Sequence, residues 1–140
     1  MLASCQCGAL TATVSGDSAR VVCHCIDCQK RSGSPFGYIA YYSTDRVEVS
    51  GESREYIRPT DLGGTFTNRF CPTCGSTILV QAGVHPDKVG IPVGAFADQN
   101  FAPPHRAVYD DRRHDWITLP EDLPTFAKGR STASSKAAQE

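Results

Sequence analysis

A chain of 140 residues is long enough for one hydrophobic core and needs no second domain. Its formal net charge of −1 and its lack of a lysine or arginine run exclude the basic field that nucleic-acid binding requires. No apolar stretch approaches the length of a membrane span, and the N-terminal residues lack the basic and apolar regions of a secretion signal. We therefore expect a cytoplasmic protein with neither a membrane nor a nucleic-acid partner.

Short strands separated by glycine and proline turns are predicted along most of the chain. Residues 7–14 alternate apolar and small polar side chains, which indicates a strand, and residues 20–25 form a second short strand pattern. Residues 26–31 lack β-branched side chains after the first position, so about one helical turn is predicted there. Further strands are expected at residues 36–42, 46–49, 53–57, 65–70, 76–81, 88–93 and 105–109, with one helical turn at 94–99. The pattern is that of an all-β fold with small helical turns and a meander-like order.

The C-terminal part of the chain, from residue 110 onward, consists of two segments that differ in composition. A polar turn at residues 110–115 precedes an apolar anchor at Trp116 and Ile117. From residue 128 onward the side chains are small, polar or charged and cannot bury enough apolar area to order themselves. We predict a single domain at residues 1–127 and a disordered tail at 128–140.

Seven cysteines in a chain expected in the reducing cytosol are not explained by disulfides. An odd number cannot all pair, and Cys5 with Cys7 or Cys23 with Cys25 would close a small strained ring. Buried free thiols would have no reason to fall into three tight clusters. Metal ligation is the remaining common use of cysteine.

One set of ligands is local. Cys23, Cys25 and Cys28 lie within six consecutive residues and can converge on one ion without distant segments. Three ligands leave a fourth position for water or substrate, as in catalytic zinc sites. The alternative is that a histidine or carboxylate completes the site, although the strand parity of His24 places it opposite Cys23 and Cys25.

The other set joins two distant segments. Cys71-x-x-Cys74-Gly75 is typical of a metal knuckle, in which a turn gathers two sulfurs. Tetrahedral zinc needs two more ligands, and the pair left is Cys5 and Cys7, whose spacing places them on one face of a strand. The predicted division is four plus three, with two zinc ions per chain. Iron–sulfur clusters fit less well, because seven thiolates do not divide into four-cysteine sites.

At these residues the chain resembles the family of glutathione-dependent formaldehyde-activating enzymes, which also contains centromere protein V. The shared motifs run through most of the length in the same order. They are Cys5-x-Cys7-Gly8, Cys23-His24-Cys25-x-x-Cys28-Gln29-Lys30, Phe70-Cys71-x-x-Cys74-Gly75-Ser76, Gly94-Ala95-Phe96-Ala97-Asp98, and His105, Trp116 and Leu123-Pro124-x-Phe126.

The resemblance implies a twisted, multi-stranded, zinc-binding β fold. It also implies a structural zinc and a second, catalytic zinc, with the same cysteine grouping that the spacing predicts. The activity that it implies is a carbon–sulfur lyase, which joins glutathione and formaldehyde to S-(hydroxymethyl)glutathione.

The residues themselves are consistent with this activity. A zinc ion with three thiolate ligands favours a thiol as its fourth ligand, and a zinc-bound thiolate can add to a small aldehyde. Lys30 and Arg31 follow the open site and can hold the carboxylates of a thiol such as glutathione, or they are solvated charges at a helix end. Two other functions remain open: a non-catalytic thiol carrier, and an interaction module in which both metals are structural.

Overall fold

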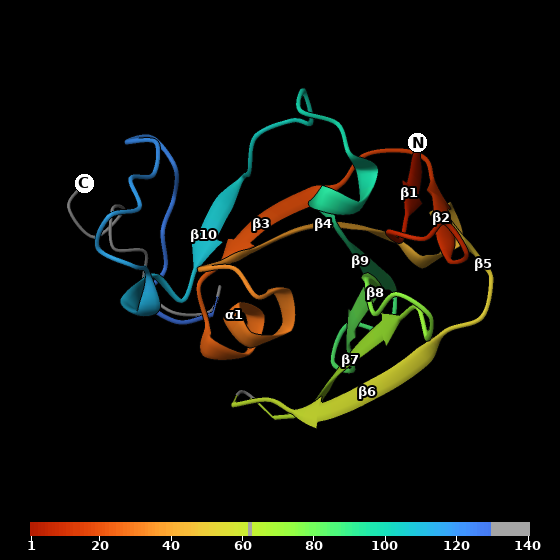
Figure 1. The fold of residues 1–140 in the computed structure, drawn as a ribbon. Coiled ribbons are helices and arrows are strands. Elements are labelled where there is room, and N and C mark those ends of the chain that lie inside the picture. Colours follow the sequence, from red (N-terminus) through yellow and green to blue (C-terminus); the bar gives the residue numbers. More distant parts are fainter. Residues whose placement is uncertain (62, 130–140) are drawn as a thin grey trace. The chain divides into compact units, whose positions relative to one another are not determined.

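The structure is a computed structural model that describes residues 1–61 and 63–129, and this part of the chain is mostly β with one short α-helix (Figure 1). The all-β prediction is confirmed. The chain forms two compact units, each built from two segments: unit 1 from Met1–Ser18 and Ala40–Phe101, unit 2 from Ala19–Ile39 and Ala102–Glu140. Neither unit is a continuous piece of sequence.

Unit 1 contains a small antiparallel sheet in the order β1 (Leu2–Ser4), β2 (Thr11–Val14) and β5 (Val47–Ser50). Ala3 lies opposite Ala12 in the register, and both side chains are fully buried. Because alternate residues of a strand face opposite sides, these small side chains define one inward face of the sheet.

A second set of strands in unit 1 follows the order β4–β9–β8–β7–β6, and Figure 1 shows β6 to β9 side by side. Ile78, Val80 and Ile91 on its central strands are fully buried, whereas most of β6, at the edge, is exposed. The first three residues of β4 belong to unit 2. The bounds are β4 Gly37–Ser43, η1 Thr44–Arg46, β6 Arg54–Pro59, β7 Thr65–Phe70, β8 Thr77–Ala82, β9 Lys88–Pro92 and η2 Val93–Phe96, where η marks a 3₁₀ turn.

Unit 2 is built on a parallel pair of strands, β3 (Ala19–Cys23) and β10 (Arg106–Val108). The chain then enters the helix α1 (Ile26–Ser32) directly after β3, and the 3₁₀ turn η3 (Asp110–Arg112) after β10. A small apolar core holds the unit together. It consists of Val22, Ala107 and Leu123, with Phe36, Tyr38 and Leu119 packed against them.

Most predicted strands are present, and three features differ from the prediction. The strand predicted at residues 7–14 starts at Thr11, because the preceding residues form a turn closed by the bond from the Gly8 amide to the Cys5 carbonyl. The helix predicted as one turn has seven residues. The parallel pairing of β3 with β10 departs from a meander, which pairs neighbouring strands in antiparallel fashion.

The predicted apolar anchor is half right. Ile117 is buried, but Trp116 is 72% exposed, so its large apolar side chain does not anchor the segment. At the start of the predicted tail, Lys128 forms an ion pair with Asp111 at 2.6 Å. Residues 130–140, the rest of that tail, lie outside the described residues.

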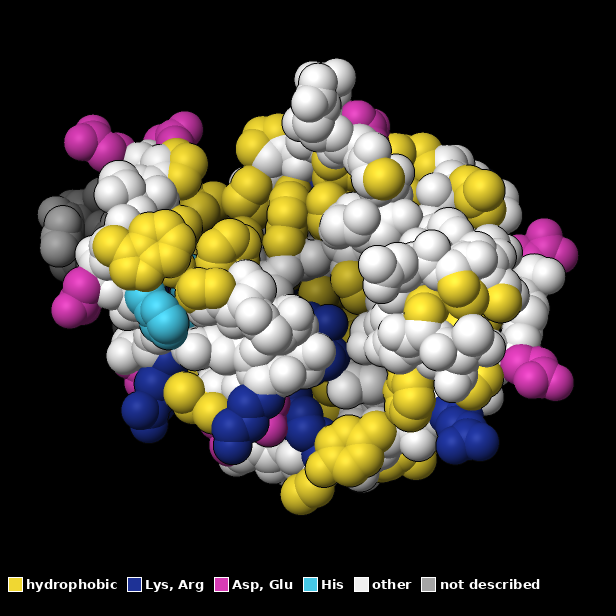
Figure 2. Space-filling view, viewed as in Figure 1, with side chains coloured by type: hydrophobic (Ala, Val, Ile, Leu, Met, Phe, Trp, Pro, Cys, Tyr) yellow, Lys and Arg dark blue, Asp and Glu magenta, His cyan; other side chains and the backbone are white. Residues whose placement is uncertain are grey.

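One face of the molecule is chemically mixed. On the face drawn in Figure 2, hydrophobic side chains are interspersed with polar ones, and the Lys and Arg side chains form separate groups. Within residues 1–61 and 63–129, no helix combines the length and the apolar character needed to cross a membrane.

Gly51 allows a close approach that a side chain would prevent. Its φ is +108°, and a Cβ there would lie 2.1 Å from the Ala9 carbonyl oxygen. We expect Gly51→Ala to lower the free energy of unfolding by about 3 kcal/mol or more, because both backbone strain and a clash must be relieved. Urea denaturation measures this. Gly16→Ala is the matched control: its φ is +80°, but the nearest atoms are 4.0 Å away, so we expect a loss of only about 1 kcal/mol. Equal losses would contradict the steric argument.

Candidate metal centres

Four cysteines of unit 1 bring their sulfurs together. The Sγ atoms of Cys5, Cys7, Cys71 and Cys74 all lie within 4.8 Å of one another. The Cys5 and Cys7 sulfurs are 3.7 Å apart, and the Cys7 sulfur is 3.6 Å from that of Cys71, 64 positions later in the chain. The structure thus groups the knuckle with the N-terminal pair.

The local backbone structure around Cys71 and Cys5 orients these sulfurs. A register shift between β7 and β8 at Arg69/Phe70 ends regular pairing just before Cys71. The chain then turns through Gly75, whose φ of +79° favours glycine, and the Gly75 amide donates to the Cys71 carbonyl at 2.9 Å. Backbone amides also donate to sulfur, from Leu10 to Cys5 at 3.2 Å and from Thr73 to Cys71 at 3.4 Å. Such bonds favour the thiolate form.

Ser76 connects the two halves of this site. Its hydroxyl oxygen accepts a bond from the Gln6 amide at 3.1 Å and lies 3.3 Å from the Cys74 sulfur. Since the oxygen accepts from Gln6, its proton is free to point at Cys74. Bonds from the side chain and backbone of Ser76 lower the pKa of the Cys74 thiol to about 5. The thiolate is the form in which a cysteine binds a metal ion.

Three cysteines of unit 2 form the second group. Cys23 ends β3, Cys25 is the N-cap of α1 and Cys28 lies in its first turn, and their sulfurs all lie within 4.8 Å of one another. The Cys25 sulfur accepts the Cys28 amide at 3.3 Å, which caps the helix and holds two ligands together. Hydrogen bonding with Cys25 and Cys28, together with burial, raises the pKa of the Cys23 thiol. Three thiolates this close are stable only with a cation among them.

No fourth metal-binding residue joins this group within the described residues. His24 lies between two of the cysteines in sequence, but its ring is fully buried and packs against Phe36, with ring centroids 5.8 Å apart. Neither ring nitrogen has a hydrogen-bond partner among the described residues. Burial lowers the pKa of His24, which keeps the ring neutral.

Of the two basic residues after the site, Arg31 lies close to it. A Cβ added to Gly37 would lie 2.7 Å from an Arg31 guanidinium nitrogen and 3.7 Å from the Cys28 sulfur. The Arg31 guanidinium and the Cys28 sulfur therefore both lie next to the backbone of Gly37. The Arg31 Nε is buried without a hydrogen-bond partner among the described residues, whereas Lys30 is exposed.

The donor sets fit zinc. A tetrahedron with Zn–S bonds of about 2.3 Å has S···S edges of about 3.8 Å. The separations of 3.7 and 3.6 Å in unit 1 agree with that edge. Both cysteine groups can hold a metal ion, and thiolates suit zinc among the common cellular metals.

Three residues that shape the two candidate metal sites were not predicted from the sequence to do so. Ser76 and Gln29 each stand next to a recognised ligand motif, yet their partners, Gln6 and Arg112, are 70 and 83 positions away. Gly37 contributes by having no side chain. The available signals were the positions of Gln29 directly after Cys28 and of Ser76 directly after the Cys-x-x-Cys-Gly knuckle.

Mutation should separate the two centres. Cys74→Ala removes a ligand that ties the start of unit 1 to its middle, so we expect the free energy of unfolding to fall by at least about 3 kcal/mol. Cys25→Ala touches a local cluster and a helix cap, and should cost about 1 kcal/mol. Wild type should contain two zinc ions per chain and Cys25→Ala one, by elemental analysis and urea denaturation. Equal destabilisation by both changes would refute the division between the sites.

Comparison with known proteins agrees with this geometry. Residues 1–112, which include all seven cysteines, match the family described as glutathione-dependent formaldehyde-activating enzyme. The crystal structure of a Rhodobacter sphaeroides protein, a structural-genomics target, is similar in fold. It is 23% identical, the match covers 74% of this chain and 92% of that one, and the TM-score is 0.52. A search of curated proteins found no match. The chain belongs to the glutathione-dependent formaldehyde-activating enzyme family.

Proposed function

We propose that the protein is a zinc-dependent carbon–sulfur lyase that joins a thiol such as glutathione to a small aldehyde such as formaldehyde, and catalyses the reverse reaction. The observation that carries this is the difference in ligand number between the two centres. Four sulfurs complete one centre, whereas three form the other with no fourth candidate among the described residues. Closed zinc sites are structural, and open ones are catalytic.

Addition of a thiol to an aldehyde requires little from the protein except a thiolate held in the correct position. Zinc, when held by Cys23, Cys25 and Cys28, supplies a soft cation that lowers the pKa of an incoming thiol. The thiol sulfur forms a bond to the aldehyde carbon, the carbonyl electron pair moves to oxygen, and the proton released by the thiol ends on that oxygen. The product is a hemithioacetal, and no oxidant or reductant is consumed.

Family membership supports the choice of glutathione and formaldehyde, which the family's description names. The position of Arg31 supports an anionic thiol. Three thiolates and a divalent cation carry a net charge of about −1, which would repel a substrate carboxylate unless a cation stood nearby. Arg31 provides that cation beside Cys28, with a buried Nε still able to donate.

Cobalt in place of zinc should report the open position. We expect the three-cysteine site to begin with three sulfurs and one oxygen ligand, and millimolar glutathione to shift its visible bands toward those of a four-sulfur tetrahedron. The bands of the four-cysteine site should not change, which gives a control within the same molecule. If glutathione, cysteine and mercaptoethanol all leave the spectrum unchanged, both metals are structural and the interaction-module function replaces this one.

The same protein in its zinc form separates an enzyme from a carrier. Formaldehyde and glutathione interconvert spontaneously with their adduct, and exchange NMR measures the rate. Catalytic amounts of the protein should accelerate this exchange, and Cys25→Ala should abolish the acceleration. Binding of thiol without acceleration would identify a carrier.

Arg31→Gln tests the carboxylate contact. We expect it to weaken glutathione binding to the cobalt site by about 10- to 100-fold, the scale of one charge-assisted bond. Mercaptoethanol, which has no carboxylate, should bind with unchanged affinity. Lys30→Gln makes the same charge change at an exposed neighbour and should have less than about a threefold effect. Equal losses for both thiols would assign Arg31 to the metal site rather than to the substrate.

A further inference from the structure

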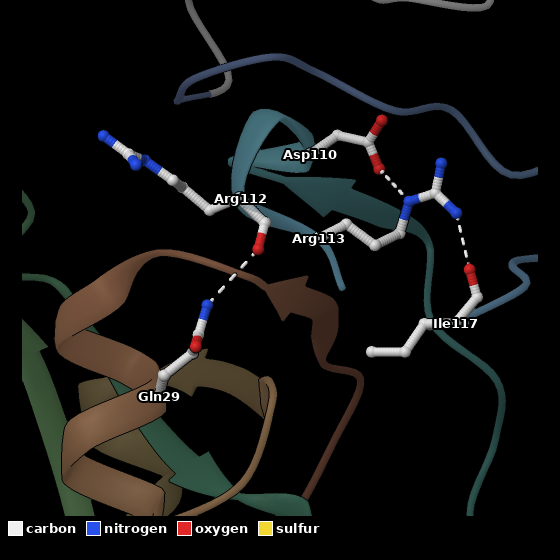
Figure 3. A network of polar contacts seen from close by, with 5 residues as sticks. All are labelled: Gln29, Asp110, Arg112, Arg113 and Ile117. Atoms are coloured by element: carbon white, nitrogen blue, oxygen red, sulfur yellow. Dashed lines mark hydrogen bonds and ion pairs between the residues drawn. The ribbon is translucent and has the colours of Figure 1, made fainter. Parts of the chain in front are cut away.

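The side chain of Gln29, the residue after Cys28, makes three hydrogen bonds within unit 2. Its amide nitrogen donates to the main-chain carbonyl of His24 at 2.8 Å and to that of Arg112 at 3.3 Å. Its amide oxygen lies 3.2 Å from the Nε2 atom of His114. Figure 3 shows the bond to Arg112, which joins α1 to the turn at η3. One side chain of α1 thus contacts both the backbone at His24 and the segment that contains Arg112 and His114.

The bonding capacity of the amide fixes the direction of each contact. A glutamine nitrogen has two donor hydrogens, and both are used by the carbonyls of His24 and Arg112. The oxygen can only accept, so His114 must carry a proton on Nε2 and donate it. All polar atoms of the Gln29 side chain are thereby engaged, and no rotation of the amide would preserve the three bonds.

The bond to His24 reaches into the metal loop. The carbonyl that accepts it belongs to the residue between the ligands Cys23 and Cys25, while Gln29 itself follows the third ligand, Cys28. The amide therefore fixes the two halves of the ligand loop relative to each other. Groups that orient metal ligands in this way tune metal affinity, although they do not touch the ion.

The other two bonds reach a segment that is braced by its own contacts. Within residues 110–117, the Arg113 side chain donates to the Asp110 carboxylate at 2.8 Å and to the Ile117 carbonyl at 2.5 Å (Figure 3). Ile117 is buried, and the amide of Arg112 donates to the Tyr109 carbonyl at 3.0 Å. These internal bonds make residues 110–117 a stiff segment. The contacts of Gln29 with Arg112 and His114 therefore restrain the segment as a whole.

We propose that Gln29 is a positioning residue that tightens metal binding at the three-cysteine site and couples that binding to the stability of residues 110–117. The inference rests on the proposed metal site but not on thiol binding or turnover there. Coupling of this kind is reciprocal: an ion that orders the ligand loop strengthens the anchoring of residues 110–117, and the anchoring strengthens ion binding by the same factor.

Gln29→Glu tests the proposal with almost no change of shape, because the carboxylate cannot donate to the two carbonyls. We expect cobalt affinity at the three-cysteine site to fall by about 10- to 100-fold, the usual effect of losing such a ligand-orienting group. The four-cysteine site should keep its affinity. Gln99→Glu introduces the same charge at an exposed position in unit 1 and should leave both sites unchanged.

Hydrogen exchange, followed by mass spectrometry, supplies a readout that a purely structural role would not move. Filling the three-cysteine site should slow exchange at the amides of Arg112 and Arg113 in wild type, and this metal effect should disappear in Gln29→Glu. His114→Ala removes one anchor but keeps the bond to His24. It should weaken the metal effect on exchange while changing cobalt affinity by less than about threefold.

Each outcome decides the matter. Unchanged cobalt affinity in Gln29→Glu, or equal losses at both sites, would overturn the positioning role. If Gln29→Glu fails to fold, an undiminished metal effect on exchange in His114→Ala would overturn the coupling. A wild-type three-cysteine site that binds no metal would overturn this inference together with the proposed function. Absence of thiol binding alone would leave Gln29 in its role and remove only the proposed reaction.

Discussion

The convergence of four cysteine sulfurs from two distant segments is the constraint on which the candidate metal site of unit 1 depends. Cys7 and Cys71 are 64 positions apart, yet their sulfurs are separated by 3.6 Å, a distance that unscreened thiolates would not tolerate. The small sheet beside this site includes a strand of only three residues, β1, which buries little apolar surface. An ion bound at this site would add its binding free energy directly to the folding free energy of unit 1.

The other centre has the same type of ligand in a local arrangement. Its ligands are neighbours in sequence, so holding an ion there contributes little to chain topology. What the surroundings supply is orientation and charge: Gln29 ties the ligand loop together, and Arg31 places a cation beside Cys28. In the proposed function, the contrast between a closed long-range site and an open local one separates stability from reactivity within one small protein.

The extent to which sequence predicts this structure follows the range of each interaction. Strand patterns and the three cysteine clusters depend on spacing over a few residues, and both are found in the structure. The joining of Cys5 and Cys7 to the distant knuckle follows from the number of ligands that zinc needs. The parallel pairing of β3 with β10, the link from Ser76 to Gln6 and the contacts of Gln29 with Arg112 and His114 join segments that are 70 to 85 positions apart. Local pattern carries no information about such partners. The exposed Trp116 shows the same limit, because hydrophobicity alone does not specify what a side chain packs against.

The sequence separation of the ligands differs between the two centres. It therefore determines when each set of ligands is complete during translation. Cys23, Cys25 and Cys28 leave the ribosome together, and the last ligand of the other set, Cys74, follows 46 residues after Cys28, a delay of about 2 to 10 seconds at ordinary translation rates. During that interval Cys5 and Cys7 are a pair of thiols without their partners, open to oxidation or to the wrong metal. The two sets of thiols therefore become complete at different stages of synthesis, the local set first.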